Sequence, residues 1–145
     1  MMDSVKTEQL LLNELRSRGL TFAAAESCTG GLIAKRITDL SGASAVFRGG
    51  VVSYTNDVKR DVLGVPQALL DEYGAVSAPV AQAMAEGVRR ITGADLGVSV
   101  TGVAGPDRDD RGNEVGTVYL AVSTAQDAYV TLFRFDGDRA AIRTA

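Results

Sequence analysis

The sequence predicts one α/β domain, a three-layer α/β/α sandwich around a mixed, mostly parallel sheet of about five strands. Segments with helical spacing of apolar residues alternate with short apolar runs typical of buried strands. The 145 residues fit a single domain. No repeat, low-complexity tract or proline-rich linker divides residues 1–145. The last two expected strands are too close in sequence for a helical crossover, so the sheet must be mixed.

The first half of the chain alternates helix and strand. The first helix is expected at 5–18, where apolar residues form a stripe: Val5, Leu11, Leu12 and Leu15. A short apolar run then predicts a buried strand at 20–25. A second helix is expected at 30–40, with Thr29 as its N-cap. The strand expected at 46–54 contains a pair of glycines, which indicates a β-bulge or a close backbone approach.

The second half contains three helices, then three strands, then a last helix. The three helices are expected at 56–64, 67–73 and 77–90. The three strands are expected at 96–101, 115–124 and 128–135, the last two paired as a hairpin. Asp138 begins the last helix, which runs only to Ala145. We expect this helix to be truncated, because its apolar stripe needs further turns beyond Ile142 to cover the sheet.

Composition excludes several kinds of site. The chain has no histidine and one cysteine, Cys28. A Ser-His-Asp triad, a Cys-His dyad, a His-ligated metal, an internal disulfide and a cysteine-based zinc site are therefore excluded. Any catalytic base must be a carboxylate, a lysine, a tyrosine or the terminal amine. We expect no metal and no cofactor, and we expect Cys28 to pack under its turn.

Charge and hydropathy limit the kinds of partner that the chain is expected to contact. The net charge is −3 and the basic residues form no stripe, so direct binding of nucleic acid is not expected. No apolar run approaches the ~20 residues of a membrane span. The first ten residues lack the apolar core of a signal peptide. We therefore expect a cytoplasmic protein that does not contact a membrane, and the sequence leaves a homo-oligomer open.

The segment 26–31, Glu-Ser-Cys-Thr-Gly-Gly, lies between an expected strand and an expected helix. Open α/β sheets bind ligands at that edge. Gly30 and Gly31 let the backbone approach a ligand closely, and the amides of a helix N-terminus favour an anion. The segment matches neither a dinucleotide fingerprint nor a Walker loop. The structural alternative is a tight turn with Thr29 as a cap.

Ser27 needs a base to act as a nucleophile. The candidates are Lys59 alone or Lys59 together with Tyr54, which converge only if the chain turns a corner between them. A free lysine has a pKa of about 10.4, so burial must lower the pKa of Lys59 by about three for it to act near pH 7. The alternative is that Lys59 is a solvated helix residue.

A second glycine-rich segment, 99–106, also follows an expected strand. Its amides and the Thr101 hydroxyl could face the same pocket as Ser27. The alternative is a flexible loop whose glycines serve turns. The charged stretch at 107–111 is expected to be solvated and is assigned no chemistry.

Together these segments resemble the CinA C-terminal domain family, the competence/damage-inducible proteins. Seven motifs carry the resemblance in order along nearly the whole chain: A-E-S-C-T-G-G at 25–31, F-x-G-G-V-V-S-Y-T-N-D-V-K at 47–59, L-G-V at 63–65, G-A-V-S at 74–77, T-G-V-A-G-P at 101–106, V-G-T-V at 115–118 and G-D-R-x-x-I-R at 137–143. The resemblance implies a three-layer α/β/α fold. It also implies an amidase that converts nicotinamide mononucleotide and water to nicotinate mononucleotide and ammonia.

The resemblance implies roles for particular residues. Ser27 is the nucleophile, Tyr54 and Lys59 assist it, and Thr101 lies in the pocket with Gly102. Thr29, Gly30 and Gly31 are expected to form the anion-binding turn, with Arg139 as the partner of the 5′-phosphate of a pyridine nucleotide. The chain departs from the family at 107–114, where a glycine-rich stretch and Lys-Pro are usual, and at its last helix. It resembles the form without an N-terminal pyrophosphatase domain.

Two other functions remain open at this stage. One is a non-catalytic nucleotide-binding or protein-interaction module linked to competence or DNA damage. The other is an amidase that acts on a different small amide. A binding module does not need a serine, a tyrosine and a lysine at three loop ends, whereas a hydrolase does.

Overall fold

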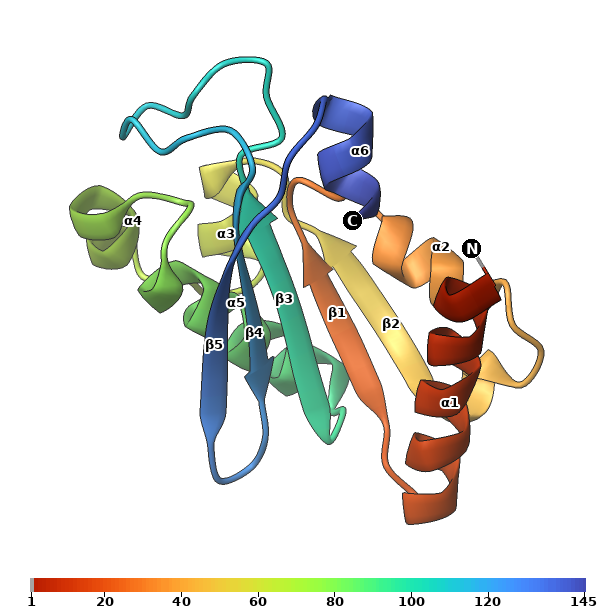
Figure 1. The fold of residues 1–145 in the computed structure, drawn as a ribbon. Coiled ribbons are helices and arrows are strands. Elements are labelled where there is room, and N and C mark those ends of the chain that lie inside the picture. The colour runs from red at the N-terminus through yellow and green to blue at the C-terminus, as the bar shows by residue number, and fades with distance from the viewer. Residues whose placement is uncertain (1) are drawn as a thin grey trace.

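The computed structural model describes residues 2–145, with side chains described from residue 7 onward. Five strands form one sheet in the order β2-β1-β3-β4-β5 (Figure 1). Their bounds are β1 Phe22–Glu26, β2 Phe47–Val52, β3 Leu96–Gly102, β4 Thr117–Ser123 and β5 Ala128–Arg134. The β2-β1-β3 pairings are parallel and the β3-β4-β5 pairings are antiparallel, so only β4 runs against the others. The predicted mixed, mostly parallel sheet is confirmed.

Helices cover both faces of the sheet, as the predicted sandwich requires (Figure 1). Their bounds are α1 Met2–Arg18, α2 Leu32–Thr38, α3 Asn56–Asp61, α4 Gln67–Tyr73, α5 Ala78–Thr92 and α6 Arg139–Thr144, with a short 3-10 turn at Ala43–Ala45. Helix α5 lies across β1, β3 and β4 on one face. Helices α1 and α2 lie on the other face, over the β1–β2 half. No helix in the described part of the chain is long and apolar enough to cross a membrane.

Small residues set the close packing of α5 on the sheet. A Cβ at Gly97 in β3 would lie 2.1 Å from the Ala85 carbonyl oxygen, so only glycine fits there. The Ser99 hydroxyl, two residues along, donates to the Ala81 carbonyl at 2.6 Å. The helix therefore rests directly on the backbone of β3, the strand that leads to the second glycine-rich segment.

The pair of glycines in β2 marks a bulge, as predicted. The register of β1 against β2 shifts between Phe22 and Ala23, so Arg48 of β2 has no opposite residue in β1. A Cβ at Gly50 would lie 3.1 Å from the Ala24 carbonyl oxygen. The hairpin of β4 and β5 is also confirmed.

Helix boundaries differ from the expected ones by a few residues. The expected helix at 56–64 ends at Asp61, because residues 62–63 form a turn before Gly64. In α1, Leu12 and Leu15 are buried, but Leu11 is 43% exposed, which corrects the predicted stripe. Leu11 lies about 100° around the helix from Leu12 and so faces away from the sheet. The side chain of Val5, also assigned to that stripe, lies outside the described residues.

The expected N-cap of α2 was wrong. Gly31, not Thr29, occupies the N-cap position, and glycine has no side chain to cap the helix. The cap is instead the carboxylate of Glu26, the last residue of β1, which is 1% exposed. It accepts from the amides of Gly31, Ile33 and Ala34 at 3.0–3.1 Å and from the Thr29 hydroxyl at 2.5 Å. Glu26 therefore joins the end of β1 to the start of α2.

The cap of the last helix is as predicted. Asp138 accepts from the amide of Ala141 at 2.9 Å. Ile142 is buried against Cys28 and Val100, so α6 packs over the turn that follows β1. Arg143 donates to the carbonyl of Cys28 at 2.9 Å, which fixes α6 to the same turn.

Replacement of Glu26 by alanine should lower the free energy of unfolding by about 2 kcal/mol or more, because buried amides at the α2 N-terminus lose their acceptor. Urea denaturation measures the change. The control is Glu14→Ala, which removes only an exposed ion pair with Arg18 and should cost about 0.5 kcal/mol or less. Equal effects of the two substitutions would contradict the capping role.

Candidate active site

A cavity of about 270 Å³ opens at the carboxyl ends of β1 and β3. Segments far apart in the sequence meet there. Its lining comes from five stretches: Ser27 and Cys28; Tyr54, Thr55, Asn56 and Lys59; Ala75 and Val76; Thr101 to Gly105 with Asp107 and Asp109; and Arg139. The carboxyl edge of a parallel sheet is where α/β proteins bind ligands, so this cavity is the candidate site.

The backbone at the end of β1 holds Ser27 in place. The amide of Ser27 donates to the Val100 carbonyl of β3 at 3.1 Å. On the other side, the amide of Ser53 donates to the Glu26 carbonyl at 2.7 Å. Both neighbouring strands thus hold the turn that presents Ser27. The hydrogen bonds of the Glu26 carboxylate to the start of α2 fix the same turn from its other end.

Lys59 contacts Ser27 directly. The Lys59 Nζ lies 2.9 Å from the Ser27 Oγ, 2.7 Å from the Ser53 carbonyl oxygen and 3.4 Å from the Tyr54 carbonyl oxygen. Lys59 is 1% exposed. No carboxylate forms an ion pair with it within the described part of the chain. Lys59 is therefore a buried amine with polar partners and no counter-charge, not a solvated helix residue.

Burial lowers the pKa of Lys59 from 10.5 to about 8, opposed by the nearby Cys28. Burial also raises the pKa of Cys28, which keeps that thiol protonated. A neutral amine suits the three contacts of Lys59 Nζ. It can donate two N–H groups to the carbonyls of Ser53 and Tyr54 and accept the Ser27 hydroxyl proton with its lone pair.

The start of helix α3 places Lys59. The Thr55 side chain caps the helix by accepting from the Val58 amide, and the Lys59 amide donates to the Thr55 carbonyl at 3.1 Å. Residues 53–55 form the corner between β2 and α3 that the sequence required for convergence. The lysine therefore points back toward the end of β1.

The Tyr54 side chain lies apart from this pair. It is 56% exposed, and its hydroxyl accepts from an Arg139 Nη at 2.8 Å. Arg139 also donates to the Gly105 carbonyl. These contacts join α6, the β2–α3 corner and the β3–β4 loop at the cavity. Only the carbonyl of Tyr54 contacts Lys59, so the Tyr54 hydroxyl does not lie between Ser27 and Lys59.

Thr101 and Gly102 line the cavity, as the sequence indicated. Thr101 is 1% exposed and its hydroxyl donates to the Ala75 carbonyl at 2.9 Å. That hydrogen bond holds the α4–α5 connection against β3. In the β3–β4 loop, the amides of Ala104 and Gly105 have no acceptor among the described residues, and both residues line the cavity.

Thr29, Gly30 and Gly31 do not line the cavity. The Gly31 amide donates to the Glu26 carboxylate and the Gly30 amide donates to the Ser27 carbonyl, so neither amide is free for an anion here. The Glu26 carboxylate already accepts from the amides at the N-terminus of α2. Arg139 is the residue of the predicted phosphate site that does line the cavity.

The β3–β4 loop contributes residues that the sequence did not assign. Asp107 and Asp109 line the cavity, and the stretch at 107–111 is largely exposed, as predicted. Arg111 donates to the Leu70, Asp71 and Glu72 carbonyls at the end of α4. The last turn of α4 contains no basic residue of its own, so its free carbonyls were the signal that a donor from elsewhere was needed.

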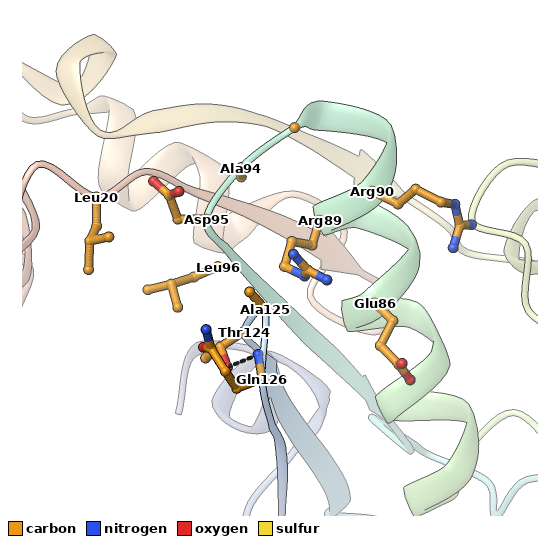
Figure 2. Close-up of a pocket in the computed structure, with 11 residues that line it drawn as sticks. Leu20, Glu86, Arg89, Arg90, Ala94, Asp95, Leu96, Thr124, Ala125 and Gln126 are labelled. Atoms are coloured by element: carbon orange, nitrogen blue, oxygen red, sulfur yellow. Dashed lines mark hydrogen bonds between the residues drawn. The ribbon is translucent and has the colours of Figure 1, made fainter.

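A larger hollow of about 870 Å³ lies at the other end of the sheet, between the end of α5 and the β4–β5 turn. Figure 2 shows Arg89, Arg90 and Glu86 projecting from α5 beside it. Its other acid, Asp95, accepts from the Thr21 amide and hydroxyl. No serine or cysteine lines it, so the smaller cavity is the candidate active site. No group of three or more potential His, Cys, Asp or Glu metal ligands occurs within the described residues.

The sequence is similar to those of several known proteins. The chain is 58% identical over 129 residues to a CinA-like protein of Geobacter sulfurreducens, covering 89% of this chain and 31% of that protein. It is 50% identical over 141 residues to a CinA-like protein of Geotalea daltonii, covering 97% of this chain and 34% of that protein. The chain thus spans about a third of the length of these relatives.

Solved structures have the same fold. The competence/damage inducible protein CihA from Agrobacterium tumefaciens superposes with a TM-score of 0.92 at 40% identity, covering 97% of this chain and 87% of that one. A CinA superfamily protein from Klebsiella pneumoniae superposes with a TM-score of 0.95 at 31% identity, covering 97% and 88%. The sequence profile of the CinA C-terminal domain matches residues 4–145. The chain belongs to the CinA C-terminal domain family.

Proposed function

We propose that this domain hydrolyses the carboxamide of nicotinamide mononucleotide, releasing nicotinate mononucleotide and ammonia. One observation carries the proposal: the buried Lys59 Nζ lies 2.9 Å from the Ser27 Oγ with no carboxylate beside it. A serine paired with a neutral amine is an activated nucleophile suited to acyl transfer. The substrate is the one that the family resemblance implies. The names of these relatives refer to CinA or to competence and damage, and they name no substrate.

Acylation begins when the Ser27 Oγ attacks the carboxamide carbon and its proton moves to the Lys59 Nζ. The C=O π electrons become the negative charge of a tetrahedral oxyanion. The amides of Cys28, Ala104 and Gly105 are among the cavity donors with no acceptor within the described residues, and they can stabilise this charge. The C–N bond then breaks, and the Lys59 proton passes to the departing nitrogen, which leaves as ammonia.

Deacylation uses the same two residues. Water attacks the Ser27 ester and gives a proton to the neutral Lys59 Nζ. The second tetrahedral intermediate then breaks the C–Oγ bond, and Lys59 returns the proton to Ser27. The products are the carboxylic acid and the regenerated enzyme. The Glu26 carboxylate accepts four hydrogen bonds at α2, so it does not serve as the proton acceptor.

Arg139 is the residue proposed to bind the 5′-phosphate. Its guanidinium lies at the cavity and donates to uncharged oxygens only, those of Tyr54 and Gly105. A phosphate can replace these acceptors with charge-assisted bonds. Tyr54, whose hydroxyl now accepts from Arg139, then becomes a second donor to the same phosphate.

Replacement of Ser27 by alanine should abolish ammonia release from nicotinamide mononucleotide and leave the fold intact, since the hydroxyl bonds only to Lys59. A coupled ammonia assay measures the rate, and thermal unfolding checks the fold. The matched control is Ser123→Ala, a buried serine in β4 that does not line the cavity. Turnover by Ser27→Ala within tenfold of the wild type would exclude Ser27 as the nucleophile.

Lys59→Arg should be nearly as inactive as Lys59→Ala, because arginine keeps the charge but cannot be deprotonated in a protein. The control is Lys35→Arg, at an exposed lysine that pairs with Asp39. Circular dichroism checks that the Lys59 variants are folded. A Lys59→Arg enzyme with most of the wild-type activity would make Lys59 a fixed charge and not a base.

The wild-type rate should rise with pH through an apparent pKa near 8 and then level off. The lowered pKa of Lys59 sets this midpoint, and only the neutral amine can accept the Ser27 proton. Below pH 8 the rate should fall about tenfold for each pH unit. The measurement is kcat/KM for ammonia release between pH 6 and about 10, and a flat profile would contradict the assignment.

A further inference from the structure

We propose that the hollow of about 870 Å³ is a second ligand site, in which Arg89 binds the carboxylate or phosphate group of a small organic anion. The hollow lies between the end of α5 and the β4–β5 turn, away from Ser27. It shares no lining residue with the candidate active site. A ligand bound here is therefore independent of the proposed amidase reaction.

Arg89 carries a polar atom that the rest of the structure leaves unpaired. Its Nε is the one buried side-chain nitrogen or oxygen without a hydrogen-bond partner among the described residues. The other nitrogens of its guanidinium also have no acceptor there, and no carboxylate in the described part of the chain forms an ion pair with it. A buried charged donor without a partner is unfavourable, so Arg89 needs an acceptor that the chain does not supply.

The usual role of a basic residue at a helix end does not account for Arg89. An arginine in the last helical turn often donates to the free carbonyls of that turn. In α5 the Thr92 carbonyl accepts instead from the Arg48 Nε at 2.6 Å. The neighbouring Arg90 donates to the Leu63 carbonyl at 3.1 Å. Arg89 lies in the same turn and bonds to no carbonyl among the described residues.

The packing of α5 on β3 directs Arg89 toward the hollow. A Cβ at Gly97 would lie 2.9 Å from the Arg89 Cβ, so the base of this side chain rests on the backbone of β3. Figure 2 shows Arg89 on the side of α5 that faces β3, whereas Arg90 projects from the other side of the helix. The Arg89 side chain is partly buried in this position. Its guanidinium is therefore held at the wall of the hollow.

The other walls suit the body of an organic ligand. Four apolar residues line the hollow: Leu20, Ala94, Leu96 and Ala125. Its two acids leave Arg89 free, since Asp95 accepts from the Thr21 amide and hydroxyl, and Glu86 is exposed and forms no ion pair within the described part of the chain. Pockets of roughly 300–1,000 Å³ hold small organic ligands.

The guanidinium sets the class of the ligand. Its Nε and one Nη form a parallel pair of donors, which matches the two oxygens of a carboxylate or a phosphate. An uncharged ligand would leave the buried charge of Arg89 unpaired. The hollow therefore suits an anion that also carries an apolar group to cover Leu20 and Leu96.

The test is an NMR titration with benzoate, with phenyl phosphate and with the neutral benzamide. The amides at 93–96 and 124–126 report on the hollow, and those at 101–105 report separately on the active-site cavity. Both anions should shift the signals of the hollow to saturation, with dissociation constants on the order of 1 mM, and benzamide should not. Saturation by only one anion also supports the site and identifies its preferred group.

Variants assign the binding to Arg89. Arg89→Gln should weaken binding of the anions at least about tenfold. Arg89→Lys keeps the charge and loses the paired donors, so it should also weaken binding, and it serves as the test if the glutamine variant does not fold. The matched control is Arg90→Gln, at an exposed arginine beside the same hollow, which should change affinity less than about twofold.

Three results would overturn the site. The first is that neither anion shifts the signals of the hollow to saturation. The second is that benzamide binds there as tightly as benzoate, which would make the hollow an apolar pocket without a role for charge. The third is an equal loss of affinity in Arg89→Gln and Arg90→Gln, which would reduce Arg89 to one surface charge among several.

Discussion

The burial of one uncompensated amine sets the requirements that the surrounding structure must meet. The Lys59 ammonium would need a counter-ion or water at its depth, but among the described residues no carboxylate forms an ion pair with Lys59, and the side chain is 1% exposed. The lowered pKa corresponds to a cost on the order of 3 kcal/mol for the protonated form. The neutral form is instead held by two backbone carbonyls and the Ser27 hydroxyl. These groups supply the hydrogen bonds of the amine, and its desolvation keeps it neutral.

Strand β1 and its neighbours hold in place the groups that contact Lys59, which are the Ser27 hydroxyl and the Ser53 and Tyr54 carbonyls. Ser27 and Ser53 follow β1 and β2, and each is bonded to the adjacent strand. The Glu26 carboxylate takes the positive end of α2 for itself, so the anion site usual at such a helix start is filled from within the chain. The hydrogen-bond donors left at the cavity include Arg139 and the amides of Ala104 and Gly105 in the β3–β4 loop.

Much of this could be predicted from the sequence. Periodicity predicted the elements and the mixed sheet, because apolar spacing follows directly from burial. Because the chain has no histidine, elimination left Lys59, alone or with Tyr54, as a candidate base for Ser27, and the family resemblance implied the same residues. The roles of Glu26 and Arg111 could not be predicted so simply. Glu26 was the first residue of the segment at 26–31 and was given no capping role, and Arg111 was expected to be a solvated charge. Both act on the backbone of a helix whose end comes near them only in the folded chain.

The most direct test of the account is the protonation state of Lys59 itself. The chain contains three lysines, at positions 6, 35 and 59, so a protein labelled with ¹³C at lysine Cε gives few signals to titrate by NMR. The Lys59→Arg variant assigns the third signal. The account predicts that this signal titrates with a midpoint near pH 8. A midpoint for Lys59 near the ordinary lysine value of about 10.4 would contradict it.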